Sequence, residues 1–324
     1  MPVPDDRRPD LVIAVVLLVL VIVVAGVAAL VVRPGQGSTL PGTPVSTATQ
    51  SPAPTATDHD PVIGPPLQPV TSDAGCAARS PRTLRVMQFN IRAGLDDAGR
   101  LEVTRIAAEI EAADPDLVSL NEVDDGTRRS GGTDEASYLS AATGLHAVFG
   151  PTLLGYDGGR FGNAILSRYP VLESHNTPLP QVTNFEARAL LTATVRVGRQ
   201  TVSFSSLHLS AGGGGTADRV LEAETVAQIL RAEQHPAVIA GDLNSEPTEL
   251  SVRILRQHLL DAQEQAGTGP GDTVDEEDPS RRIDYVLYDD HFAPVEGSTQ
   301  VLPSAVSDHR SVVTDLALLP SRGC

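Results

Sequence analysis

The sequence predicts an α+β sandwich, in which two β-sheets pack together with helices outside, preceded by one transmembrane helix and a disordered linker. Three observations predict this organisation. Residues 11–32 form an unbroken apolar run, residues 33–75 are rich in Pro, Ser and Thr, and from Cys76 onward short β-branched runs alternate with turn residues and a few amphipathic helices. The folded domain is therefore expected to occupy residues 76–324.

The apolar run of residues 11–32 has no charge and no Pro over its 22 residues. At about 1.5 Å per residue, a helix of this length spans a hydrocarbon core of about 30 Å. The alternative, a cleaved secretory signal, has a shorter apolar stretch and a clear small-residue cleavage site. Arg7 and Arg8 precede the run, and only Arg33 follows it closely. We therefore expect a single-pass plasma-membrane protein with residues 1–10 in the cytoplasm and the domain outside it.

The linker of residues 33–75 cannot build a core. Of the 42 residues from 34 to 75, 9 are Pro and 11 are Ser or Thr. Such a composition buries too little apolar surface to repay the entropy of ordering the chain. An extended tether that holds the domain away from the membrane is expected.

The charge of the chain constrains its partners. The formal net charge is -17, and all 24 cationic residues are Arg. An acidic surface repels polyanions and weighs against avid, sequence-independent binding of nucleic acid. It does not exclude a nuclease, because bound divalent cations offset charge locally, and the simplest interpretation is that acidity keeps the domain soluble.

Strands are predicted where short β-branched runs are bounded by turn residues. These runs are Leu84–Ile91, Leu117–Asn121, Ala164–Ser167, Ala189–Val197, Val202–His208, Ala237–Ala240, Ile283–Tyr288 and Val312–Leu318. Helical periodicity predicts helices at Leu101–Ala113, Asp134–Thr143 and Thr216–Glu233. The first of these ends before Pro115, because Pro disfavours a helical residue before it.

The only two cysteines, Cys76 and Cys324, lie beyond the first and last predicted strands. A disulfide is allowed outside the cytoplasm, and the thiols could meet if these strands are antiparallel neighbours. We expect the bridge; two unpaired or intermolecular thiols are the alternative.

Polar side chains recur at the ends of predicted strands, and a single one would be an ordinary turn residue. Six separate segments supply them, namely Asn90, Glu122, His208, Asp242 with Asn244, Asp284, and Asp308 with His309. These segments could converge at one rim of the sandwich. Carboxylates, amides and imidazoles without a cysteine cluster suit a hard cation such as Mg²⁺ or Mn²⁺. Phosphoester hydrolysis needs such a set.

The span from about Thr83 to Leu318 resembles the endonuclease/exonuclease/phosphatase superfamily, which has a deoxyribonuclease I-like fold. The matching motifs occur in the family's order: Gln-Phe-Asn-Ile, Leu-Asn-Glu-Val, Gly-Asn-Ala-Ile-Leu-Ser-Arg, Ser-Leu-His-Leu, Gly-Asp-Leu-Asn-Ser, Arg-Ile-Asp-Tyr-Val and Ser-Asp-His-Arg. Each motif is weak alone, and the ordered set is specific. The resemblance implies a four-layer α/β/β/α sandwich of two mixed β-sheets flanked by helices, with the site at one edge.

The resemblance also implies a metal and water group. Glu122 would be the principal metal ligand, helped by Asn90 and Asp308. Asp242 would position or activate the attacking water, and Asn244 would orient that water or hold phosphate.

A second group implied by the resemblance contacts phosphate. His309, supported by Asp284, would donate to the phosphate as negative charge builds. His208 would contact phosphate and assist the leaving group. Arg188 and Asn163 lie in segments that match less closely, and Arg188 is equally interpretable as a structural ion-pair partner.

The resemblance implies a metal-dependent phosphoric ester hydrolase, and we expect a monomeric phosphodiesterase of a phospholipid headgroup or small phosphoester. A nuclease acting on DNA or RNA outside the cytoplasm is the alternative. A non-catalytic binding module of the same fold would be expected to lose the metal and water residues, and a passive surface protein would not need them. The absence of Trp argues against the inositol phosphatase branch, which usually carries a Trp before the late Asp.

Overall fold

The computed structural model describes residues 81–183, 186–274 and 281–320. The expected membrane segment 11–32, the linker 33–75 and the two cysteines, Cys76 and Cys324, lie outside these residues. Within the described ranges, no helix is long and apolar enough to cross a membrane. The anchor, its topology and the disulfide therefore stay predictions.

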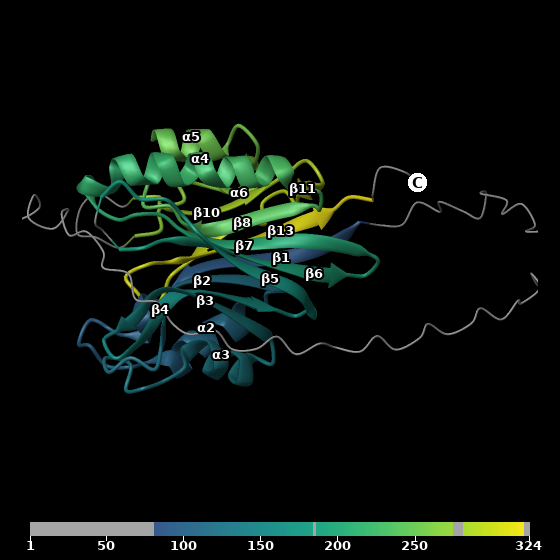
Figure 1. The fold of residues 1–324 in the computed structure, drawn as a ribbon. Helices are drawn as coiled ribbons and strands as arrows, with labels where there is room; N and C mark the ends of the chain where they lie inside the picture. Colours follow the sequence, from purple (N-terminus) through teal and green to yellow (C-terminus); the bar gives the residue numbers. More distant parts are fainter. Residues whose placement is uncertain (1–80, 184–185, 275–280, 321–324) are drawn as a thin grey trace, which may run out of the picture. The chain divides into compact units, whose positions relative to one another are not determined.

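Two mixed β-sheets stack face to face (Figure 1). The seven-stranded sheet has the order β11-β13-β1-β2-β4-β3, with β12 paired to β13. Its strands are β1 (Arg82–Asn90), β2 (Leu117–Asp125), β3 (His146–Tyr156), β4 (Gly159–Ser167), β11 (Phe292–Pro294), β12 (Gln300–Leu302) and β13 (Ser311–Leu318). The six-stranded sheet has the order β5-β6-β7-β8-β10-β9. Its strands are β5 (Val171–Pro178), β6 (Ala189–Val197), β7 (Gln200–His208), β8 (Ala237–Asp242), β9 (Leu260–Asp261) and β10 (Asp284–Tyr288).

Helices cover the outer face of each sheet, so the sandwich has the four layers α/β/β/α (Figure 1). The helices are α2 (Val103–Ala113), α3 (Glu135–Thr143), α4 (Thr216–Ala232), α5 (Leu250–Leu255) and α6 (Ala262–Ala266), with short 3-10 turns η1 (Arg92–Gly94) and η2 (Gly213–Gly215). Ile106 of α2 packs in one cluster with Phe89 of β1. Val226 of α4 packs in another with Ile239 of β8. The predicted four-layer sandwich is confirmed for the described residues, and the transmembrane helix and linker that were expected before it stay predictions.

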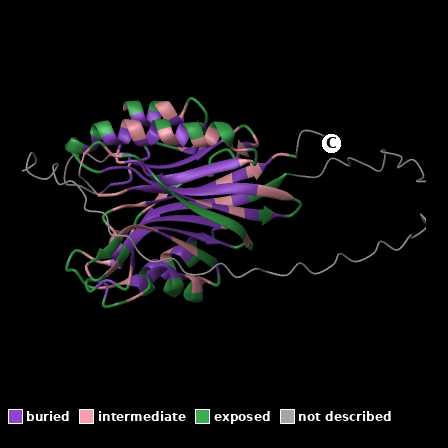
Figure 2. Cartoon of the chain, in the orientation of Figure 1, coloured by how far each residue is buried: buried purple, intermediate pink, exposed green. Residues whose placement is uncertain are grey.

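The inward-facing side chains change from apolar to polar along several strands. Alternate residues of a strand face the same side, and in β1 Leu84 and Val86 belong to the core between the sheets. Gln88 and Asn90 continue that row and are equally buried. Strands β7 and β8 likewise end in buried polar residues, and Figure 2 shows that the central strands of both sheets are mostly buried. One end of the inter-sheet layer is thus a hydrocarbon core and the other is polar.

All eight predicted strands and all three predicted helices are present, with ends shifted by a few residues. The prediction missed edge strands β3 and β5 and several short elements. All but the first residue of β5 are exposed. A strand without a buried face has no apolar alternation, so pattern reading could not find it.

Glu135 carries a fully buried carboxyl behind β2. The Asp124 amide donates to its Oε2 at 2.8 Å, and Oε1 has no hydrogen-bond partner among the described residues. Burial raises the pKa of this carboxyl to about 8. The folded state therefore binds a proton that the unfolded state loses near pH 4.5. This contribution to the free energy of unfolding is complete below that pH and is lost as the pH rises through about 8.

Glu135→Gln is therefore expected to flatten the fall in stability between about pH 5 and 8, by a few kcal/mol, because the amide stays neutral. Urea unfolding of the variant and the wild type across this range measures the effect. Parallel stability curves for the two proteins would show that the Glu135 carboxyl titrates normally.

Candidate active site

The predicted site residues lie at one end of the sandwich, where the inward-facing residues of the strands change from apolar to polar. Asn90 ends β1, Glu122 lies in β2, Arg188 precedes β6, His208 ends β7, Asp242 ends β8, Asn244 follows it, Asp284 begins β10, and Asp308 and His309 precede β13. Strand register places Asp242 directly between His208 on β7 and Asp284 on β10. Three side chains of the second sheet are therefore fixed in one row by backbone pairing alone.

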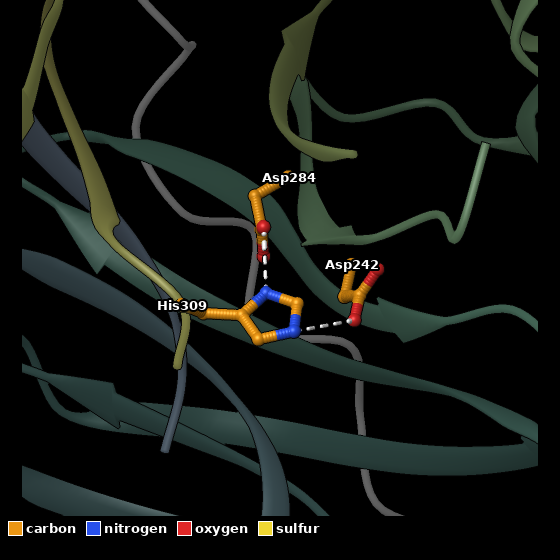
Figure 3. A group of neighbouring side chains, drawn as sticks. All are labelled: Asp242, Asp284 and His309. Atoms are coloured by element: carbon orange, nitrogen blue, oxygen red, sulfur yellow. Dashed lines mark hydrogen bonds and ion pairs between the residues drawn. The ribbon is translucent and has the colours of Figure 1, made fainter. Parts of the chain in front are cut away.

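The imidazole of His309 lies between two buried carboxylates (Figure 3). Its Nδ1 donates to Asp284 Oδ2 at 2.9 Å, and its Nε2 lies 3.8 Å from Asp242 Oδ2. Burial lowers the pKa of His309, but the charge and hydrogen bond of Asp284, with the charge of Asp242, outweigh burial and raise it to about 10. Burial, then the charge of Asp284, raises the pKa of Asp242 to about 7. His309 is therefore a cationic hydrogen-bond donor, and the neighbouring Asp242 is a carboxylate that readily accepts a proton.

Asn90 joins the two sheets at the site. Its Nδ2 donates to Glu122 Oε1 and to Asp242 Oδ2, both at 3.0 Å. Its Oδ1 accepts from the backbone N–H of Arg92 at 3.1 Å. The amide thus turns its nitrogen, not its oxygen, toward the two carboxylates, and binding a cation would require the amide to turn over. The metal-ligand role of Asn90 stays a prediction.

Glu122 is presented by a distortion of β2. The β2–β4 register shifts between Leu120 and Val123, and Glu122 has a φ of 56°. A left-handed backbone is strained for a residue other than Gly. The irregularity turns Glu122 toward Asn90 instead of continuing the strand's alternation.

His208, Asn244 and Arg188 form the other side of the site. The Nδ2 of Asn244 donates to His208 Nε2 at 3.1 Å, and Arg188 Nη1 lies 3.5 Å from His208 Nδ1. Burial, then the positive charges of Arg188 and His309, lowers the pKa of His208 well below its usual value, so this imidazole is neutral. Arg188 is 4% exposed, its contact with Glu186 is 3.5 Å long, and its Nε has no partner among the described residues. A buried guanidinium with such long contacts is available to an anion.

Asp308 lies outside the cluster of largely buried side chains formed by Asp242, Asp284 and His309. Its side chain is 48% exposed and lies 3.7 Å from Nε of Arg92. Arg92 was not among the predicted residues, although it directly follows the Gln-Phe-Asn-Ile motif. Its φ of 51° and its ion pair with Asp97 at 2.6 Å hold its guanidinium at the rim of the site.

Comparison with known families decides the identity of the domain. Residues 87–309 match the Endonuclease/Exonuclease/phosphatase family. The chain belongs to this family. An endonuclease/exonuclease/phosphatase from Beutenbergia cavernae is 32% identical, over 75% of this chain and 73% of its own, with a TM-score of 0.63.

Two further solved structures of lower identity share the fold. The human Nocturnin catalytic domain with bound sulfate is 21% identical over 73% of this chain and 94% of its own, with a TM-score of 0.56. Truncated TDP2 from Caenorhabditis elegans is 19% identical over 72% and 97%, with a TM-score of 0.54. A comparison with curated proteins found no match.

Members of the endonuclease/exonuclease/phosphatase family are typically metal-dependent phosphoester hydrolases, and the donors at this site fit a divalent cation. The carboxylates of Glu122 and Asp242 both lie 3.0 Å from the Asn90 amide nitrogen, and the described residues include no cysteine. Oxygen-rich sets of this kind suit Mg²⁺ or Mn²⁺. Burial, then the negative charge of Asp284, raises the pKa of Asp242, and a cation bound nearby would favour the charged carboxylate.

Proposed function

We propose that this protein is a Mg²⁺- or Mn²⁺-dependent phosphodiesterase that acts outside the cytoplasm on a phospholipid headgroup or small phosphoester. The main support is the position of Asp242, which lies within 4 Å of His309, His208 and Asn90. The net charge of -17 favours these substrates over nucleic acid. The location rests on the apolar run of residues 11–32 and the arginines before it.

In the proposed site, Glu122 would hold the metal with Asp308, and Asn90 would join them once its amide turns over. When bound, the ion neutralises charge on the phosphoryl oxygens. Asp308 already lies on the open side of the site, where it can reach an incoming ligand without costly desolvation.

The protein groups then divide the remaining work. Asp242 accepts the proton of the attacking water, because its carboxylate is buried at the centre of the site and its Oδ2 lies 3.8 Å from His309 Nε2. His309, held by Asp284, donates a hydrogen bond to a phosphoryl oxygen as charge builds. Arg188 supplies a buried positive charge for the phosphate.

Metal dependence provides the direct test. The purified protein is expected to hydrolyse a bis-aryl phosphodiester with Mn²⁺ and to lose at least about 100-fold of its rate in excess chelator, because a metal ion at such sites lowers the barrier by several kcal/mol. Returning Mn²⁺ or Mg²⁺ should restore the rate. Hydrolysis that persists unchanged in chelator would contradict the proposed metal site.

A substrate panel then tests the proposed class. Sphingomyelin, phosphoinositides, small diesters, monoesters, duplex DNA and RNA are compared by kcat/KM with each metal. Faster hydrolysis of the lipid or small diester supports the proposal. A preference for DNA or RNA would leave the metal-dependent chemistry intact and make the protein a nuclease.

A further inference from the structure

Two buried amides, Gln88 and Asn121, lie directly behind the site. Both are 0% exposed. Gln88 precedes Asn90 in the inward row of β1, and Asn121 precedes Glu122 in β2. Neither reaches the open side where substrate would bind, so any influence on the reaction must pass through other residues.

The amide of Asn121 uses all of its hydrogen-bonding capacity and links the two sheets. Its Oδ1 accepts from Gln88 Nε2 at 2.7 Å and from the backbone N–H of Asp242 at 2.9 Å. Its Nδ2 donates to Asn163 Oδ1 at 3.0 Å and to the Leu207 carbonyl at 3.2 Å. An amide has two donor hydrogens and two acceptor lone pairs. If the Asn121 amide turned over, its nitrogen would face two donors and its oxygen would face two acceptors, so its orientation is fixed.

Asn121 in turn fixes Gln88. The Nε2 of Gln88 donates to Asn121 Oδ1 and, at 3.2 Å, to Asp284 Oδ1. Because both neighbours are acceptors, the amide nitrogen must face them, and Oε1 is left without a hydrogen-bond partner among the described residues. A buried unpaired oxygen is costly, which indicates that the two bonds from Nε2 outweigh it.

The other oxygen of Asp284, Oδ2, accepts from His309 Nδ1 at 2.9 Å. One carboxylate is therefore held on its buried side by Gln88 and on its open side by the imidazole. The chain of contacts runs from Asn121 through Gln88 and Asp284 to His309 and spans both sheets.

We propose that Gln88, oriented by Asn121, is a positioning residue that holds the Asp284 carboxylate in the rotation that fixes His309 for its contact with phosphate. This inference rests on the proposed function, because it assigns a support to the donor of that reaction. A carboxylate that loses one charged hydrogen bond turns more freely. The imidazole it carries then spends less time aligned with the reacting phosphate.

The test uses a bis-aryl phosphodiester with saturating Mn²⁺ and the full-length protein. Gln88→Met keeps the length of the side chain and removes the donor. It is expected to lower kcat by about 10- to 100-fold, as for a hydrogen bond to a charged group, with KM changed less than about twofold. Gln88→Leu also lacks the donor and is expected to lower kcat at least as much, so either variant can carry the test if the other does not fold.

Ser119→Ala is the matched control. Its Oγ makes a comparable buried link between the sheets, donating to the Ala240 carbonyl at 2.9 Å and lying 2.8 Å from Ser206 Oγ. The control is expected to lower the melting temperature and to leave kcat unchanged. A matching loss of kcat in Ser119→Ala would show that Gln88 acts only through general stability.

A double-mutant cycle with His309→Ala separates the inference from the function on which it rests. If Gln88 acts through His309, Gln88→Met has less than about a twofold effect on kcat in the His309→Ala background. An equal effect in both backgrounds, or no effect in the wild type, overturns the inference. An unchanged kcat in His309→Ala itself overturns the proposed role of His309 instead.

Discussion

Replacing Asp242 with Asn is expected to lower kcat on a phosphodiester by about 10³-fold, because the variant keeps the shape of the site and loses its proton acceptor. Asp242 is 1% exposed and lies 3.8 Å from His309 and 3.6 Å from His208. Its Oδ2 also accepts from Asn90 Nδ2 at 3.0 Å, so the carboxylate is held in one position, as a general base requires. The measurement is kcat at saturating Mn²⁺ and substrate.

Asp315→Asn is the control for this substitution. Asp315 pairs with Arg85 at 2.9 Å on the β1–β13 ladder, three residues along β1 from the Gln88 pairing and away from the site. Both partners are partly exposed, so the control is expected to lose about 1 kcal/mol of stability or less and no activity. An Asp242→Asn protein with a wild-type melting curve and more than about a tenth of the wild-type kcat would refute the assigned role.

The fold was predictable wherever a strand has one buried face. The row Leu84, Val86, Gln88 and Asn90 of β1 has period two, and the structure places all four against the second sheet. Edge strand β5 lacks such a row, because its side chains are exposed and none of them needs to be apolar for packing. Hydrophobic periodicity in the sequence reveals a strand only where one of its faces is buried.

The site was predictable as a set of residues and only partly as a geometry. Strand-end position identified Asp242, His208 and Asp284, and the strand register places them side by side. The bond from Gln88 to Asp284 joins residues 196 positions apart, and no local pattern encodes how two sheets align. The signal that was missed is the amide of Gln88, which replaces an apolar residue on the same inward row as Asn90.

Glu122→Gln is expected to weaken Mn²⁺ binding by about 100-fold. Changing a residue that only supports a metal ligand already costs about 10- to 100-fold in affinity, so changing a ligand itself is expected to reach the upper end of that range. Gln keeps the length of the side chain and removes the charged oxygen that a hard cation prefers. Isothermal titration calorimetry with Mn²⁺ measures the effect without substrate. Activity at very high Mn²⁺ should recover in part, because the proton acceptor and the phosphate contacts are intact.

The control for Glu122→Gln is Asp125→Asn, which removes the same unit of charge from the same strand. Asp125 pairs with Arg160 and belongs to the regular β2–β4 register. If the affinity for Mn²⁺ falls equally in both variants, Glu122 acts only through the general field of the acidic domain. The backbone argues for a specific role. Glu122 is held at a φ of 56°, strain of about 1 kcal/mol or more that proteins keep mainly where a side chain must be presented to a ligand.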